Sequence, residues 1–337
     1  MTSQTAADTG LRQRWNAGHI PDQTGRVCVV TGANSGLGLA TARALVAKGA
    51  HVILAVRDEE KGRRAIEEAA GGADAAGRAG AVGQAGAGGA GRGRWEVRRL
   101  DLADLDSVRE CAERLRTEHP RLDLLVNNAG VMAPPRTLSA QGHELQFAVN
   151  HLGHFALTGL LLEPLAEGRD PRVVTVSSVN HRKAHLFLDD LMGERRYSPM
   201  GHYNQSKLAN AVFGHQLHRR LTAAGSPVRS VLAHPGYTAT QLQFSAPVGL
   251  WRVVFGRIGN PLLAQRPERG ALPQLYAATE PGVRGGEFIG PDGTAELRGA
   301  PTRVALAPSA TDEKTGHRLW EESEHLTGVH YGLPATG

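Results

Sequence analysis

The stretch that decides the fold is Thr31-Gly32-Ala33-Asn34-Ser35-Gly36-Leu37-Gly38. An apolar run at residues 27–30 enters it, and from Leu37 onwards apolar residues recur at helical spacing until Lys48 and Gly49. Glycine permits positive φ and close backbone approach, so main-chain N–H groups and the positive end of the helix can face a pyrophosphate. The stretch therefore predicts a nucleotide-binding turn, although an ordinary glycine-rich turn between a strand and a helix has the same residues.

Apolar runs and amphipathic segments alternate along the rest of the chain. We expect strands at residues 27–30, 51–56, 95–100, 122–126, 172–177, 228–233 and 286–289. Helices are expected at 59–70, 107–119 and 312–325, around Asn150 and Tyr203, and from near Pro267. Strands that alternate with helices predict an α/β fold with a doubly wound parallel sheet, the Rossmann fold.

The sequence is expected to form a single domain with extensions. We place an N-terminal arm at 1–24, a dinucleotide-binding domain at 25–290 and a C-terminal extension at 291–337. Residues 70–94 are almost all Gly and Ala with a few Arg, so we expect a disordered surface loop there. Residues 240–266 are rich in apolar and aromatic side chains. This favours a substrate lid, although packing onto the core or a second subunit fits equally.

Composition argues against several classes of protein. Of the 337 residues 41% are hydrophobic, enough for a large core, but only 5% are aromatic, which argues against nucleic-acid binding despite the formal charge of +5. The longest apolar stretch, at 155–162, is too short to span a bilayer. The only two cysteines, Cys28 and Cys111, offer no disulfide framework. We therefore expect a cytoplasmic protein without a membrane span.

The end of the second expected strand bears on the choice of cofactor. An NAD site places a carboxylate there to bind the ribose 2′-hydroxyl, and Val56 cannot do so. Arg57 could pair with a 2′-phosphate and stack on adenine, while Asp58 keeps NAD(H) possible. An Arg-Asp pair that caps the next helix would have the same sequence. We expect NADP(H) to be the preferred cofactor.

Small or polar residues follow the third and fourth expected strands. Asp101-Leu102 follows the third strand, and Asp101 could bind the adenine amine or cap the next helix. Asn127-Asn128-Ala129-Gly130 follows the fourth and would form a floor for the adenosine ribose, because a bulky side chain there would block the cofactor. An Asn-rich turn without a ligand would look the same.

Tyr203 and Lys207 lie four residues apart in an expected helix, so their side chains share one face. A cation beside a phenol favours the phenolate and brings the pKa of the tyrosine closer to the range of a general acid/base. A surface pair is the plain alternative, because Tyr-x3-Lys often arises by chance. Asn150 is a poor helix former inside another expected helix, which hints at function, though it could equally bond a neighbouring turn.

Taken together, these residues resemble the short-chain dehydrogenase/reductase family over roughly residues 25–289. The motifs occur in that family's order: the glycine turn, Asn127-Asn128-Ala129-Gly130, Asn150, Ser178, Tyr203-x3-Lys207 and His234-Pro235-Gly236. Residues 150–155 and 203–210 are most similar to its retinol-dehydrogenase-like branch, which also contains WW-domain oxidoreductases. Two features depart from that branch: the Gly/Ala insertion and the lack of the hydrophobic N-terminal anchor of membrane-bound retinol dehydrogenases.

The resemblance implies a role for each motif. Tyr203 would exchange a proton with a carbonyl or alcohol oxygen, and Ser178, rather than Ser177, would orient that oxygen. Lys207 would hold the nicotinamide ribose and lower the tyrosine pKa, and Asn150 would hold a water that connects Lys207 to solvent. The implied cofactor contacts are Gly32, Asn34, Ser35, Gly36, Leu37, Gly38, Arg57, Asp101, Leu102, Asn128, Ala129, Gly130, Tyr203, Lys207, Pro235, Gly236 and Thr238.

The expected function is that of an NADP(H)-dependent oxidoreductase that interconverts a carbonyl and an alcohol on a small lipophilic molecule. The alternative is a non-catalytic NADP(H)-binding sensor or scaffold. A homo-oligomer is possible, and no nucleic-acid partner is expected. No metal is expected either, because the histidine pairs lack zinc-protease spacing and are interpreted as helix-surface or loop residues: His151/His154, His181/His185 and His215/His218.

Overall fold

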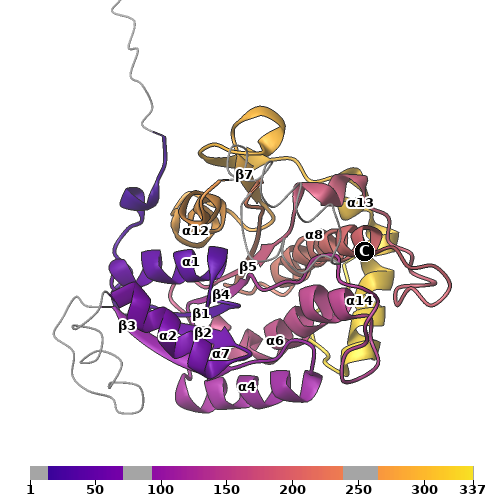
Figure 1. Ribbon diagram of the computed structural model, residues 1–337, viewed down its shortest axis with the longest axis horizontal. Helices are drawn as coiled ribbons and strands as arrows, with labels where there is room; N and C mark the ends of the chain where they lie inside the picture. The colour runs from indigo at the N-terminus through magenta and orange to yellow at the C-terminus, as the bar shows by residue number, and fades with distance from the viewer. Residues whose placement is uncertain (1–13, 71–92, 238–264, 337) are drawn as a thin grey trace, which may run out of the picture.

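The computed structural model describes residues 14–70, 93–237 and 265–336, and they form one eight-stranded sheet with helices on both faces (Figure 1). All neighbouring strands are parallel except the last pair, which is antiparallel. The strands in spatial order are β3 (Arg94–Arg99), β2 (His51–Val56), β1 (Val27–Thr31), β4 (Leu124–Asn127), β5 (Arg172–Val176), β6 (Arg229–Ala233), β7 (Phe288–Pro291) and β8 (Pro301–Val304). This is the predicted doubly wound Rossmann fold.

Helices cover the two faces because successive strand residues point to opposite sides. In β1, Val30 packs into the core of one face and Val29 into that of the other. The first face carries α1 (Gly36–Ala47), α2 (Glu59–Ala70), α11 (Pro267–Gly270) and α12 (Leu272–Thr279). The second face carries α4 (Leu105–Glu118), α6 (Gly153–Leu160), α7 (Leu162–Ala166) and α8 (Pro199–Ala223).

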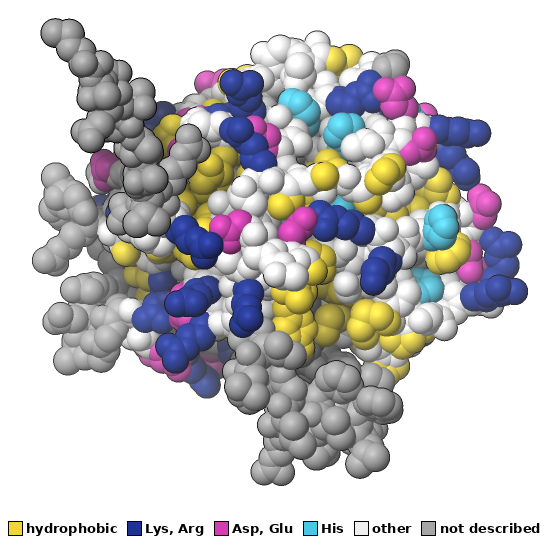
Figure 2. Space-filling model, turned by 90° about the horizontal axis from the view of Figure 1, so that it is seen from above, with side chains coloured by type: hydrophobic (Ala, Val, Ile, Leu, Met, Phe, Trp, Pro, Cys, Tyr) yellow, Lys and Arg dark blue, Asp and Glu magenta, His cyan; other side chains and the backbone are white. Residues whose placement is uncertain are grey.

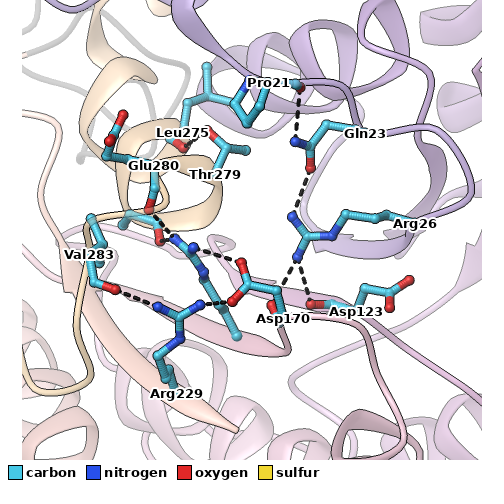
Figure 3. Close-up of polar contacts among 12 residues, drawn as sticks. Pro21, Gln23, Arg26, Asp123, Asp170, Arg229, Leu275, Thr279, Glu280 and Val283 are labelled. Atoms are coloured by element: carbon cyan, nitrogen blue, oxygen red, sulfur yellow. Dashed lines mark hydrogen bonds and ion pairs between the residues drawn. The ribbon is translucent and has the colours of Figure 1, made fainter. Parts of the chain in front are cut away.

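Buried arginines tie together the amino-terminal edge of the sheet (Figure 3). The Arg172 side chain at the start of β5 is fully buried and donates to two carbonyl oxygens, those of Ala277 in α12 and Glu280 after it, both at 2.9 Å. It also pairs with Asp170 at 2.7 Å, and Arg229 at the start of β6 pairs with the same carboxylate. Burial lowers the pKa of Arg172 to about 10, so the guanidinium stays charged at neutral pH and suits the negative end of a helix.

The predicted strands and helices are confirmed to within a few residues up to β6, but the sheet continues beyond the predicted last strand. β7 begins two residues later than expected, at Phe288, and β8 then pairs with it in the antiparallel sense. Nothing in the hydropathy pattern marked β8, because its sequence Pro-Thr-Arg-Val is short and only partly apolar. Proline and a charged residue are typical of an edge strand, where one side of the backbone needs no partner strand.

Residues after the predicted domain complete the core on the second face. After the short helix α13 (Pro308–Thr311), α14 (Glu313–Thr327) packs on α8 and α6. The ring of Trp320 lies 5.2 Å from Phe155 and 4.7 Å from Tyr331, and the Arg220 guanidinium lies 4.4 Å from its centre. The Tyr331 hydroxyl donates to Phe155 O at 2.6 Å. The predicted helix is therefore present, and its apolar stripe is buried.

Some expectations concern segments that lie outside the described residues, and others concern membrane spans and the charge of the surface. The Gly/Ala-rich segment 70–94 and the proposed lid 240–266 lie almost wholly outside the described residues, as does Thr238. In the described part of the chain, no helix is both long and apolar enough to cross a bilayer. On the face shown in Figure 2, Lys and Arg side chains are spread out and interspersed with acidic ones.

Replacing Trp320 by alanine should lower the free energy of unfolding by about 3–5 kcal/mol, because a large aromatic side chain leaves a cavity in a packed cluster. Denaturant unfolding of both proteins measures the difference. Leu138→Ala is the control, since this side chain is 48% exposed and its loss should change stability by no more than about 0.5 kcal/mol. Equal effects of the two substitutions would contradict a core role for α14.

Candidate active site

The candidate site lies at the carboxyl edge of the sheet, where open α/β folds bind their ligands. β1 ends there in the glycine turn and β4 in residues 128–130, while β5 ends in Ser177-Ser178 and β6 in His234-Pro235-Gly236. The structure thus brings the motifs of four separate strands to one edge. Arg57 and Asp101 lie at the ends of β2 and β3, further along the same edge.

The glycine turn has the geometry of an anion-binding turn. Gly32 and Gly36 adopt positive φ, at 65° and 55°. A Cβ on Gly38 would lie 2.6 Å from both Gly32 O and Asn128 Nδ2, so only glycine lets α1 start this close to the end of β4. The side chain of Ser35, the N-cap residue of α1, makes no capping hydrogen bond within the described residues. The first N–H groups of α1 therefore suit a phosphate.

The Thr31 hydroxyl connects the end of β1 to the end of β4. It accepts hydrogen bonds from Asn128 N at 2.9 Å and Ala129 N at 3.0 Å, and it lies 2.9 Å from His154 Nε2. His154 Nδ1 lies 3.0 Å from the carbonyl oxygen of Asn150, which can only accept, so Nδ1 carries the proton and Nε2 accepts from Thr31. Burial lowers the pKa of His154 to about 4, which keeps the ring neutral.

Asn150 lies in a π-helical turn, η2 (Ala148–Leu152), between α5 (Leu145–Phe147) and α6. Its side chain accepts from Val131 N at 2.8 Å and donates to Val131 O at 3.0 Å and to Ser206 Oγ at 2.9 Å. Its amide therefore joins the loop after β4 to α8. π-turns are often found at functional sites. The predicted water-holding role of Asn150 stays a prediction.

Ser178, Tyr203 and Lys207 converge from β5 and α8. The Ser178 side chain lies close enough to the Tyr203 phenol to lower its pKa, whereas Ser177 Oγ donates to Lys207 O at 2.7 Å and points to the helix. Lys207 Nζ is buried, lies 5.9 Å from the centre of the Tyr203 ring and donates to Val176 O at 3.3 Å. The choice of Ser178 over Ser177 as the residue beside the tyrosine agrees with this geometry.

The pKa shifts of Tyr203 and Lys207 differ in part from what we expected from the sequence. Burial raises the pKa of Tyr203 to about 12, opposed by the hydrogen bond with Ser178, whereas we expected Lys207 to lower it. Burial likewise lowers the pKa of Lys207 to about 8. The physical reason is that removing both groups from water disfavours both charged forms, and at this separation the ammonium does not outweigh that cost. The phenol is therefore protonated at neutral pH.

The residues at this edge fit a dinucleotide. A Cβ on Gly130 would lie 3.1 Å from Asn150 Oδ1 and 3.5 Å from Lys207 Nζ, so a side chain there would fill the floor of the site. Among the described residues, Val176 O is the one acceptor that bonds Lys207 Nζ, which leaves N–H donors for ribose hydroxyls. The cradle of glycines, the open start of α1 and this buried ammonium suit a phosphate at one end and a ribose at the other.

The residues proposed to choose the cofactor differ in their contacts. Arg57 is exposed, and within the described residues it makes no hydrogen bond or ion pair. Asp58 is occupied, because its carboxylate accepts from Lys61 N at 3.1 Å at the start of α2. Asp101 accepts from Ala103 N at 3.0 Å, and the cap of α4 is Asp104 instead. The interpretation of Asp101 as the cap of α4 is therefore wrong.

Two histidines anchor the site loops to the C-terminal segment, a role that sequence analysis did not expect of them. His181 Nδ1 lies 2.7 Å from Ser178 O, and its Nε2 accepts from Ala307 N at 3.1 Å. His234 Nδ1 accepts from Gly236 N at 3.2 Å, and its Nε2 donates to the Glu296 carboxylate at 2.9 Å. Both loops beside the site are thus held by residues beyond position 290.

Glu296 is the centre of this anchor. Its carboxylate also accepts from Arg182, at 2.7 and 2.9 Å, and its backbone has φ of 55° directly after Ala295 at 52°. Two consecutive non-glycine residues in the left-handed region are strained, and such strain persists only where surrounding contacts enforce it. The only signal in the sequence for a turn near Glu296 is the run of turn-forming residues at 290–293.

The expectation that the paired histidines lie on helix surfaces or in loops is wrong for three of them. His151, His154 and His181 are at most 1% exposed and hydrogen-bonded. His185 is exposed, as expected. Helical spacing alone cannot tell the buried face of a helix from its surface when polar residues occur on both.

Comparison with known proteins identifies the family. The model of the short chain dehydrogenase family matches residues 26–247. Human retinol dehydrogenase 14 is 38% identical over 90% of this chain and 87% of its own length, and mouse polyprenol dehydrogenase is 39% identical over 93% and 87%. The crystal structure of an uncharacterised protein from Mycobacterium paratuberculosis, 40% identical, matches with a TM-score of 0.75 over 95% of this chain and all of that one.

The chain is therefore an NAD(P)-dependent oxidoreductase of the short-chain dehydrogenase/reductase family that acts on CH–OH groups. Within that family it belongs to the retinol-dehydrogenase-like branch. The predicted family, fold and enzyme class are confirmed. The substrate and the dinucleotide that it prefers are taken up as proposals below.

Replacing Glu296 by glutamine should destabilise the protein at neutral pH and less so in acid. Burial raises the pKa of Glu296, but hydrogen bonds from His234 and Arg182 outweigh it and hold the pKa below the ordinary 4.5. A depressed pKa stabilises the fold above the unfolded-state value, and this contribution is lost as pH falls through the folded-state value. Urea unfolding from about pH 7 to about pH 3 should show the gap between wild type and Glu296→Gln shrinking once the pH falls below about 4.5.

The control for this comparison is Glu163→Gln, which breaks an exposed ion pair with Arg116 and should cost little at any pH. A gap between wild type and Glu296→Gln that stays constant with pH would contradict the anchor.

Proposed function

We propose that this chain uses NADP(H) to interconvert a carbonyl and an alcohol on a lipophilic small molecule, with Tyr203 as the general acid/base. The observation that carries the proposal is the convergence of the Ser178 hydroxyl, the Tyr203 phenol and the Lys207 ammonium at one edge of the sheet. A protein that only bound the dinucleotide would have no chemical need for a serine hydroxyl beside a buried tyrosine. The alternative of a sensor or scaffold is thereby disfavoured.

The Tyr203 phenol is placed to give its proton to a carbonyl oxygen during reduction and to take it back during oxidation. With a pKa raised to about 12 the phenol stays protonated at neutral pH, which suits the reducing direction. The Ser178 hydroxyl beside it can bond the same oxygen and so fix the distance over which the proton moves. When bound, the nicotinamide supplies the hydride donor or acceptor that no side chain provides.

The dinucleotide would be held by the glycine turn and the floor after β4. Open N–H groups at the start of α1 would bind the pyrophosphate, and the free donors of Lys207 Nζ would bind ribose hydroxyls. Asn150 keeps Gly130 and Val131 in place below them through its hydrogen bonds to Val131 and Ser206. Lys207 with its pKa of about 8 can also pass a proton towards Tyr203 near neutral pH.

NADP(H) is preferred over NAD(H) because of the side chains at the end of β2. Val56 is buried and offers no carboxylate for a ribose 2′-hydroxyl. Asp58 is occupied at the start of α2, whereas the exposed Arg57 guanidinium is available for a 2′-phosphate.

A lipophilic substrate is supported by side chains in the segments that border the site. Phe187, between Ser178 and Tyr203 in the chain, is 55% exposed, and Tyr237, directly after Gly236, is 38% exposed. Two relatives are named for retinol and polyprenol, both apolar alcohols. The cytoplasmic location and the homo-oligomer stay predictions.

Replacing Tyr203 by phenylalanine should lower kcat by about a hundredfold or more for NADPH-dependent reduction, while NADPH binding stays within a few fold, because only the proton donor is removed. Turnover against a panel of apolar aldehydes and ketones, with NADPH fluorescence titration, measures both. Tyr276→Phe is the control, since this half-buried tyrosine lies in α12. If the wild type turned over no substrate faster than Tyr203→Phe, the sensor would be favoured instead.

Replacing Arg57 by alanine should weaken NADPH binding by about tenfold or more and leave NADH binding almost unchanged, because a charged hydrogen bond to the 2′-phosphate is lost. Titration of both dinucleotides gives the two affinities. Arg63→Ala in α2, where the arginine pairs with Glu59, is the matched control. An equal loss for both dinucleotides would defeat the NADP(H) assignment.

A further inference from the structure

A cluster of potential metal ligands lies away from the active site, where β2, β3 and α4 meet. His51 is the first residue of β2, Glu96 is the third of β3, and His119 is the C-cap of α4. β2 and β3 are parallel neighbours, and α4 packs against β3. The cluster is therefore formed by three elements whose relative positions the sheet and its helix layer fix.

The three side chains meet through one carboxylate oxygen. His51 Nε2 lies 2.9 Å and His119 Nε2 3.1 Å from Glu96 Oε2, and the three ligand atoms all lie within 4.8 Å of one another. In a tetrahedral zinc site with bonds of about 2.0–2.1 Å, ligand atoms are about 3.4 Å apart. The two distances from histidine to carboxylate would therefore have to lengthen by only a few tenths of an ångström to match that geometry.

We propose that His51, Glu96 and His119 bind a divalent transition-metal ion, for which Zn²⁺ is the best match. Two imidazole nitrogens and one carboxylate form a ligand set that zinc accepts with water in the fourth position, whereas Mg²⁺ and Ca²⁺ prefer oxygen ligands alone. The side chains of His51, Glu96 and His119 are 23%, 12% and 14% exposed, so the site is mostly shielded but still in contact with solvent.

The surroundings of Glu96 suit this assignment. Both histidines and Arg98 lie within hydrogen-bond distance of the Glu96 carboxylate, which all three side chains share. Arg98 Nη2 pairs with Glu96 Oε1 at 2.8 Å and leaves Oε2 for the ion. Metal-ligating carboxylates are usually oriented by such an outer partner. Arg98 also pairs with Glu118, which offsets its positive charge beside the ion.

The proposed ion would join the edge strand β3 to the end of α4. β3 is the outermost strand on that side of the sheet, and β2 is the one strand in the sheet with which it pairs. An ion that binds only the folded arrangement adds to stability in proportion to the logarithm of its concentration above the dissociation constant. We therefore expect Zn²⁺ to raise the melting temperature without any change in the active-site residues.

The test uses the full chain without a purification tag, stripped with a chelator and then titrated with ZnCl₂ by calorimetry. We expect saturation at one equivalent and an upward shift of the melting temperature. His119→Gln and Glu96→Gln should each weaken Zn²⁺ binding at least about tenfold, because each removes a ligand. His330→Gln is the matched control, since this histidine also lies near a carboxylate, that of Glu324, but is 72% exposed and has no third ligand in the described residues.

A second measurement, on the wild type alone, tests the proposal even if a variant does not fold. Co²⁺ added to the stripped wild type should give the intense visible absorption of a four-coordinate site, and Zn²⁺ should abolish it by displacement. No saturable binding at one equivalent, or wild-type affinity in His119→Gln and Glu96→Gln, would overturn the proposal. The cluster would then be an ordinary hydrogen-bonded group in which two histidines and Arg98 neutralise Glu96.

Discussion

The Thr31 hydroxyl is the contact on which the site depends most. It accepts from two backbone N–H groups after β4 and donates to the neutral His154, whose other nitrogen donates to the backbone of Asn150. One side chain at the end of β1 thereby fixes the glycine turn, the floor after β4 and the π-turn relative to one another. The two bonds of His154 are buried and the two bonds after β4 are part-buried, and leaving a buried partner without its hydrogen bond would cost about 1–3 kcal/mol, so these contacts hold the three segments together.

The C-terminal part of the chain performs two structural tasks for the family's fold. α14 buries the apolar face of α6 and α8 through Trp320, while residues 296 and 307 hold the loops after β6 and β5 through His234 and His181. Burial lowers the pKa of both histidines, which favours their neutral forms. The candidate active site, which is formed by β5, β6 and α8, therefore depends on residues that come later in the chain than all three elements.

Tyr203 and Lys207 illustrate why the spacing of two residues along a helix does not predict their pKa values. Tyr203 and Lys207 lie on one face of α8, as their spacing of four requires, yet both side chains are buried. Desolvation of both groups outweighs their mutual effect, so the tyrosine pKa rises instead of falling. The same burial keeps the phenol protonated at neutral pH.

Sequence alone predicted the strands up to β6, the glycine turn and the enzyme family, and it proposed Ser178, Tyr203 and Lys207 as the reacting groups, because apolar periodicity and short motifs depend on neighbouring residues. It did not reveal β8, the anchor at Glu296 or the trio of His51, Glu96 and His119. Each of these joins residues far apart in the chain that carry no local pattern. Only the tertiary structure could decide them, because burial, hydrogen-bond partners and pKa shifts are set by which distant side chains exclude water from a group.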